Sequence, residues 1–86
     1  EYTIIDELLA VAKAGEQTST LKLGKTYTDL LVTPDYQSSY VWLSIAQAYG
    51  LESASGLLSK VADELTLEEI LVQQEQASTT FSEINS

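Results

Sequence analysis

The amino-acid sequence predicts an all-α fold of about five antiparallel helices, built from stacked repeats in a single domain over residues 1–86. Two observations lead to this prediction. Apolar residues recur at helical spacing, and Gly or Pro separates the periodic segments. The chain also resembles itself at an offset of 35 positions, which is typical of stacked repeats. The matched pairs are Gly15 with Gly50, Ser19 with Ala54, Leu23 with Leu58, Gly24 with Ser59 and Lys25 with Lys60.

The first predicted helix covers residues 3–14 and ends at Gly15, a residue that favours the left-handed conformation found after a helix. Its apolar residues fall into two sets at helical spacing, which together predict a broad buried face. The main set is Ile5, Leu8, Leu9 and Ala12, and the second set is Ile4 and Val11.

The second predicted helix covers residues 17–29, with Leu23, Tyr27 and Leu30 on one apolar stripe. Gly24 lies in its middle, where glycine costs about 1 kcal/mol relative to alanine. We expect another helix to approach the backbone closely at Gly24, and a merely tolerated glycine is the alternative.

The third predicted helix covers residues 35–49, after a break from Leu31 to Pro34. It begins either with Pro34 as its first helical residue or with Asp35 as its N-cap. Its large side chains occupy two faces, so we expect it to be sandwiched between neighbours, with Trp42 between layers. One face carries Tyr36, Tyr40 and Leu43, and the other carries Trp42, Ile45 and Tyr49.

The fourth predicted helix covers residues 52–65, and its inward residues are Ala54, Leu57, Leu58, Val61, Ala62 and Leu65. Thr66 with Glu69 then forms the pattern of a capping box and opens the fifth helix, residues 67–83. The fifth helix has a narrow apolar stripe, as expected of a terminal cap. The stripe consists of Leu67, Ile70, Leu71, Gln74, Ala77 and Phe81, and the Ser- and Thr-rich part from Ala77 onward is expected to fray.

Composition excludes several classes of function. The net charge of −9 disfavours binding to nucleic acid or to an anionic membrane, because both require a basic surface. An 86-residue chain buries a thin core with little room for a deep catalytic cavity. Cys and His are both absent, so thiolate chemistry and the commonest general base and metal ligands are missing, and we predict no cofactor.

The first residue is Glu1 and the chain contains no Met, which indicates a processed chain or a piece of a longer one. A cleaved signal peptide would not be visible in such a sequence. The compartment therefore stays open between periplasm and cytoplasm.

Two constellations with chemical potential are weighed and rejected. Ser19 and Lys22 have the Ser-x-x-Lys spacing of serine acylases, but the accompanying motifs are missing. The acidic pairs at 63–64 and 68–69 offer oxygen ligands for a cation, but their spacing is not that of a calcium loop. We predict neither an enzyme nor a metal site.

At the level of motifs the chain resembles the Sel-one-like repeat family, which is related to the tetratricopeptide repeat. The resemblance covers about residues 12–77 and includes the segments Tyr40 to Gly50 and Leu65 to Ile70. The single residues that carry it are Leu23, Gly24, Tyr27, Pro34, Asp35, Tyr40, Trp42, Ala46, Gly50 and Ala54.

The resemblance implies antiparallel helix pairs stacked into a short right-handed superhelix that presents a concave surface to a protein partner. The first helix of each pair would line that surface. An equally weighted alternative is that these positions are ordinary solvated helix residues. The candidate protein-binding residues are Thr18, Lys22, Lys25, Thr26 and Asp29 in one repeat and Ser55, Ser59 and Asp63 in the next.

The resemblance and the composition together predict a non-catalytic bacterial module for protein–protein interaction. After Lys60 the chain has six acidic residues and no basic one, so a basic partner would be attracted to this end. The first alternative is an acidic inhibitor or immunity protein that neutralises a basic toxin or enzyme. The second is the C-terminal cap of a longer repeat scaffold, and a homo-oligomer is also considered because so few repeats are present.

Overall fold

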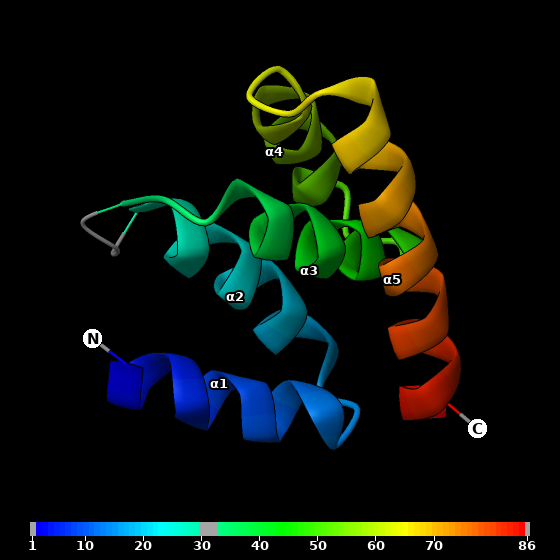
Figure 1. Ribbon diagram of the computed structural model, residues 1–86. Helices are drawn as coiled ribbons and strands as arrows, with labels where there is room; N and C mark the ends of the chain where they lie inside the picture. The colour runs from blue at the N-terminus through cyan, green and yellow to red at the C-terminus, as the bar shows by residue number, and fades with distance from the viewer. Residues whose placement is uncertain (1, 30–32, 86) are drawn as a thin grey trace.

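The computed structural model describes residues 2–29 and 33–85, and it contains five α-helices within these ranges (Figure 1). They are α1 (Tyr2–Lys13), α2 (Gln17–Asp29), α3 (Tyr36–Ala48), α4 (Ser53–Ala62) and α5 (Leu67–Asn85). No strand occurs in the described ranges, so the predicted all-α class is confirmed. Leu30 and the first two residues of the predicted break, 31 and 32, lie outside the described residues. None of the described helices is both long enough and apolar enough to cross a membrane.

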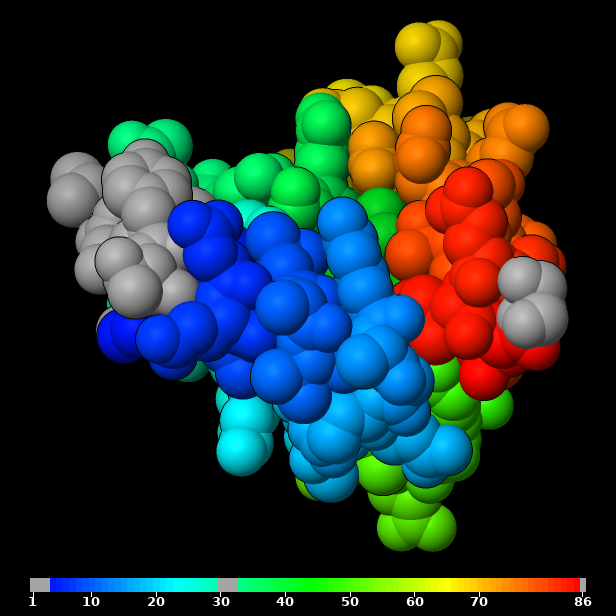
Figure 2. All heavy atoms as spheres, turned by 90° about the horizontal axis from the view of Figure 1, so that it is seen from below, coloured from blue at the N-terminus to red at the C-terminus, as the bar shows by residue number. Residues whose placement is uncertain are grey.

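Helix α3 is the centre of the fold. It packs against α2, α4 and α5, whereas α1 packs mainly against α2 (Figure 1). Viewed from below, α1 covers one face of the molecule, and the end of α5 lies beside it (Figure 2). Because three helices surround α3, its side chains must be apolar on more than one face.

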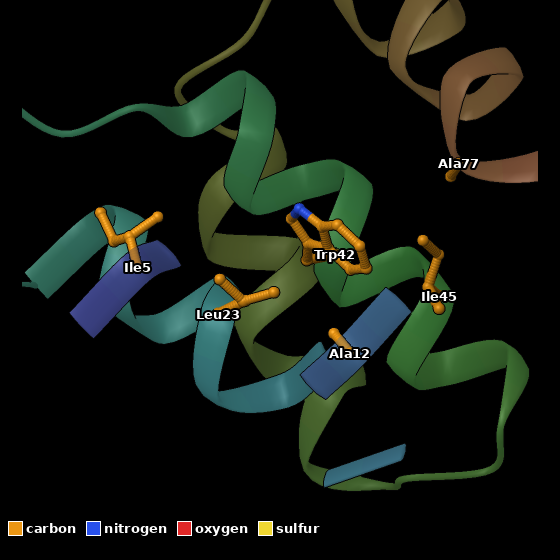
Figure 3. Packing of buried hydrophobic residues seen from close by; sticks show 6 residues of the cluster. All are labelled: Ile5, Ala12, Leu23, Trp42, Ile45 and Ala77. Atoms are coloured by element: carbon orange, nitrogen blue, oxygen red, sulfur yellow. The ribbon is translucent and has the colours of Figure 1, made fainter. Parts of the chain in front are cut away.

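Two core clusters occupy opposite faces of α3, as the sequence predicts. The first joins α3 to α1, α2 and α5, and Figure 3 shows Trp42 lying among side chains from these helices. The second joins α3 to α4. The buried residues of the first cluster are Ile5, Ala12, Leu23, Trp42, Ile45 and Ala77. Those of the second are Tyr40, Leu43, Leu58 and Val61.

Gly24 marks the closest approach of α2 to α3. A Cβ atom added at Gly24 would lie 2.5 Å from both Cγ and Cδ2 of Leu43, a distance that packed carbon atoms do not adopt. The hydroxyl of Ser39 also donates a 2.6 Å hydrogen bond to the Gly24 carbonyl. The predicted close approach is therefore confirmed, and the glycine is required for it.

The ends of the helices follow the predicted local chemistry. Gly15 and Gly50 have φ values of 101° and 89°, the left-handed region that lets a chain leave a helix. Asp35 is the N-cap of α3, because its carboxylate accepts a 3.1 Å hydrogen bond from the backbone N–H of Ser38. This result selects the Asp35 alternative for the start of the third helix.

The capping box before α5 is also confirmed. The backbone N–H of Glu69 donates to the Thr66 hydroxyl at 3.2 Å, and the N–H of Thr66 donates to the Glu69 carboxylate at 2.8 Å. The amide of Gln37 donates a further 2.7 Å bond to Glu69, which connects the start of α3 to the start of α5. Hydrogen bonds from the Thr66 backbone and from Gln37 hold the pKa of Glu69 below its ordinary value.

Two expectations about burial in the outer helices are wrong. Ile4 and Val11 were expected on the buried face of α1, but they are 47% and 44% exposed. Leu67 and Leu71 were expected on the inward stripe of α5, but they are 72% and 57% exposed. These outer helices meet few neighbours, and one neighbour covers only part of a broad apolar face.

The Ser- and Thr-rich end of α5, where fraying is expected from composition, is helical to Asn85, two residues beyond the predicted end. Ala77 is buried, and the ring of Phe81 lies 5.1 Å from that of Tyr49. Asn85 donates hydrogen bonds to the Tyr49 hydroxyl at 3.2 Å and to the Phe81 carbonyl at 2.8 Å. Contacts with α3 thus support a segment whose composition alone favours disorder.

Glu16 caps α2, a role that the sequence analysis did not assign. Its carboxylate accepts hydrogen bonds from the backbone N–H groups of Thr18 at 3.1 Å and Ser19 at 3.0 Å, and from both hydroxyls. These bonds, led by those from the Ser19 and Thr18 hydroxyls, lower the pKa of Glu16 from 4.5 to about 2. The carboxylate satisfies N–H groups that the first turn of a helix leaves unpaired.

The low pKa of Glu16 predicts a loss of stability in acid. Because the pKa is lower in the folded chain, the stabilising effect is fully present above about pH 4.5 and is lost as the pH falls toward 2. Urea unfolding followed at several pH values should show a weaker dependence over this window in Glu16→Gln than in the natural chain. Glu7→Gln, on the exposed surface of α1, is the matched control. Equal pH dependence in Glu16→Gln and the natural chain would contradict this role of Glu16.

Candidate partner-binding groove

At the offset of 35 positions, residues of α2 and α4 agree in burial at some positions but not at all of them, because Gly24 is buried whereas Ser59 is exposed. Leu23 and Leu58 are both buried against α3, although in different clusters. Ser19 and Ala54 are small and buried near the start of their helices.

A groove with a volume of about 470 Å³ lies where α2, α3 and α4 meet. Its apolar side chains come from α3 and α4, and its charged side chains come from α2 and from the end of α4 and the turn that follows it. The apolar lining residues are Tyr36, Leu43, Leu57 and Val61. The polar ones and the glycine are Gly24, Lys25, Thr28, Asp29, Lys60 and Glu64.

The charges of the groove come in two equivalent pairs. Lys25 precedes Asp29 by four residues, and Lys60 precedes Glu64 by four, so each pair is separated by about one helical turn. The offset of 35 relates Lys25 to Lys60 and Asp29 to Glu64. Two of the four basic residues of this acidic chain thus line one groove.

Neither lysine of the groove is neutralised within the described part of the chain, where no ion pair involves Lys25 or Lys60. Asp29 accepts a 3.3 Å hydrogen bond from the Thr28 hydroxyl. Exposed ammonium and carboxylate groups beside apolar surface offer both charge recognition and area for burial, the combination found at protein interfaces.

The structure brings together two of the eight predicted binding residues, because Lys25 and Asp29 both line the groove. Thr26 was expected to face outward, but it is 7% exposed and its hydroxyl donates to the Lys22 carbonyl at 2.7 Å. This expectation is corrected, since the side chain lies on the inner part of α2. The other predicted residues are exposed outside the groove, and they are Thr18, Lys22, Ser55, Ser59 and Asp63.

Sequence reasoning missed Lys60 and Glu64 as groove residues. The signal was available, since adding the repeat offset to Lys25 and Asp29 reaches both positions. No comparable feature of the sequence predicted the apolar residues that line the groove. Tyr36 and Leu43 were correctly assigned to one face of α3, but helical spacing does not say that part of this face stays accessible between α2 and α4.

The structure also places the residues of the two rejected sites, the Ser19 and Lys22 pair and the acidic pairs. The hydroxyl of Ser19 donates to the carboxylate of Glu16, and the Ser19 side chain is buried, whereas Lys22 is exposed. Among the described residues, no group of three or more acidic side chains is arranged to hold a metal ion.

Comparison of the chain with protein-family models, with curated proteins and with solved structures found no match. The resemblance to Sel-one-like repeats therefore stays a prediction based on motifs.

Proposed function

We propose that this protein is a non-catalytic module for protein–protein interaction, and that a segment of its partner binds in the groove between α2, α3 and α4. In this proposal α2 and α3 form one repeat of the Sel-one-like type, and α4 begins the next. The single observation that carries the proposal is the groove itself, with accessible apolar surface between two equivalent Lys and acid pairs.

The chemistry of the lining favours a peptide segment over a small metabolite. Each of the two walls contributes one lysine and one acid, so a partner that carries both charges can be matched. Tyr36 and Leu57, which are both half-buried, add an aromatic and an aliphatic contact, and buried aromatic contacts contribute strongly to binding energy. A docked helix or an extended segment would satisfy these features.

Charge reversal in the groove is expected to remove partner binding. The test captures the partner from the source cell with the natural chain and measures its affinity by calorimetry. Lys25→Glu with Lys60→Glu should weaken binding by about tenfold or more, because two contacts become repulsive. Lys13→Glu with Lys22→Glu is the matched control, since both residues lie outside the groove and the change in net charge is equal.

The control variant distinguishes binding in the groove from a general effect of net charge on affinity. Equal loss in both double variants would show that net charge alone governs binding, and undiminished binding by the groove variant would contradict the proposal. Circular dichroism of each variant verifies that the helices are retained.

A second candidate function is the acidic inhibitor of a basic toxin or enzyme. The observation that favours it is the acidic C-terminal part, where no basic residue follows Lys60. The two functions differ in their response to salt. Binding of a basic enzyme to the acidic C-terminal part should weaken steeply as ionic strength rises. Binding in the groove, where two lysines and two acids are combined with apolar contact, should weaken less.

A further inference from the structure

The outer face of α5 carries large apolar side chains that belong to neither core cluster of the described chain. Leu67, Leu71 and Val72 are 72%, 57% and 53% exposed, and all three lie in the first half of the helix. The opposite face of α5 holds the helix on α3 through residues such as Ala77. The stability of the domain therefore does not explain the three exposed side chains.

Acidic residues interrupt this apolar surface in a regular way. Each residue of an α-helix is rotated by about 100° from the one before it. Glu68 and Glu75 therefore lie in nearly the same direction from the axis of α5, between the directions of Leu71 and Val72. Both glutamates are exposed. The face is thus a row of carboxylates with apolar side chains on both sides, and the sequence supplies no cation to neutralise it after Lys60.

A trough of about 270 Å³ adjoins this surface between α3 and α5. Val72 forms part of its wall, and Val41 and Trp42 of α3 line it as well. An apolar side chain of a helix lying along α5 would find additional apolar contact there. The outer face of α5 together with this trough is called the α5 surface below.

We propose that the α5 surface binds an amphipathic helix of another protein, with Lys or Arg residues facing Glu68 and Glu75 and apolar residues on both sides. Helices bind helical surfaces through apolar residues at such spacing, and opposite charges fix the register. A second copy of this chain fits poorly, because the same row of carboxylates would meet itself. The site is separate from the groove and does not depend on the function proposed for it.

The test uses two synthetic helical peptides labelled with fluorescein. In the first, Lys occupies positions i and i+7 with Leu at the flanking positions, and in the second Glu replaces each Lys. Fluorescence anisotropy should show binding of the Lys peptide to the full chain, and about tenfold or more weaker binding of the Glu peptide.

Matched variants locate the binding. Glu68→Gln with Glu75→Gln, and separately Leu71→Ser, should each weaken binding of the Lys peptide by about tenfold, because they remove the charge match or the apolar contact. The control Glu7→Gln with Glu52→Gln changes the net charge equally on other exposed surfaces and should change affinity by less than about twofold.

Three results would overturn the proposal. They are equal binding of the two peptides, equal weakening by the control variant, and undiminished binding by Leu71→Ser. A dimer in analytical ultracentrifugation that Leu71→Ser dissociates would assign the α5 surface to self-association instead. Leu71 is mainly exposed, so Leu71→Ser is expected to fold, and circular dichroism verifies this.

Discussion

Trp42→Ala is expected to lower the free energy of unfolding by about 3 to 5 kcal/mol, the largest effect of any single substitution considered for this chain. Trp42 is 6% exposed and lies in the cluster that joins α3 to α1, α2 and α5 (Figure 3). Removing the indole would leave a cavity shared by four helices. Native proteins are stable by only about 5 to 15 kcal/mol, so this substitution should remove a large fraction of the stability of the domain.

Urea unfolding followed by circular dichroism measures this effect, since the substitution removes the Trp that would report by fluorescence. Leu71→Ala is the matched control, because Leu71 is 57% exposed and should change stability by less than about 0.5 kcal/mol. A loss below about 1 kcal/mol in Trp42→Ala would mean that Trp42 does not occupy the core.

Gly24→Ala is expected to destabilise the protein by about 1 to 3 kcal/mol, although alanine is the better helix former by about 1 kcal/mol. The added methyl group would lie 2.5 Å from Cγ and Cδ2 of Leu43. Leu43 is 1% exposed, so it has little free space into which to move. Overpacking therefore outweighs the gain in helix propensity.

A double-mutant cycle separates these two effects. Leu43→Ala alone leaves a cavity and should cost about 2 to 5 kcal/mol. In the Leu43→Ala background the obstacle is gone, so Gly24→Ala should become neutral or stabilising. If Gly24→Ala stabilises the natural chain as well, α2 and α3 do not approach as closely as the structure shows.

Local chemistry made much of the fold predictable from sequence. The left-handed glycines, the Asp35 cap and the capping box at Thr66 each depend on a few neighbouring residues, and each is confirmed. The two apolar faces of α3 were predictable because this helix is covered on both, so its whole apolar pattern is used in packing.

The outer helices show where this reasoning fails. Helical spacing defines an apolar sector of α1 or α5, but the neighbouring helix decides which part of the sector is covered. In α5 the contact with α3 centres on Ala77 and leaves Leu67 and Leu71 in solvent. In α1 the contact centres on Ile5 and Ala12 and leaves Ile4 and Val11 partly exposed.

The candidate groove was predictable only in part. The repeat offset is enough to connect Lys25 with Lys60, because it needs no knowledge of packing. Whether Lys25 and Lys60 line the same groove depends on the angles at which α2 and α4 cross α3. These angles are set by the packing of the core and cannot be read from helical spacing. Thr26 failed as a surface residue for the same reason, since the angle at which α2 meets its neighbours buries it.

The central claim is that α3 is held between α2 and α4, so that their charged residues share one groove. Nuclear Overhauser spectroscopy with labelled leucine and valine methyl groups tests it most directly. Leu43 methyl protons should show cross-peaks both to the Hα protons of Gly24 and to methyl groups of the α4 residues in its cluster, Leu58 and Val61. Cross-peaks to only one of the two helices would contradict the claim, because no groove would then form between α2 and α4.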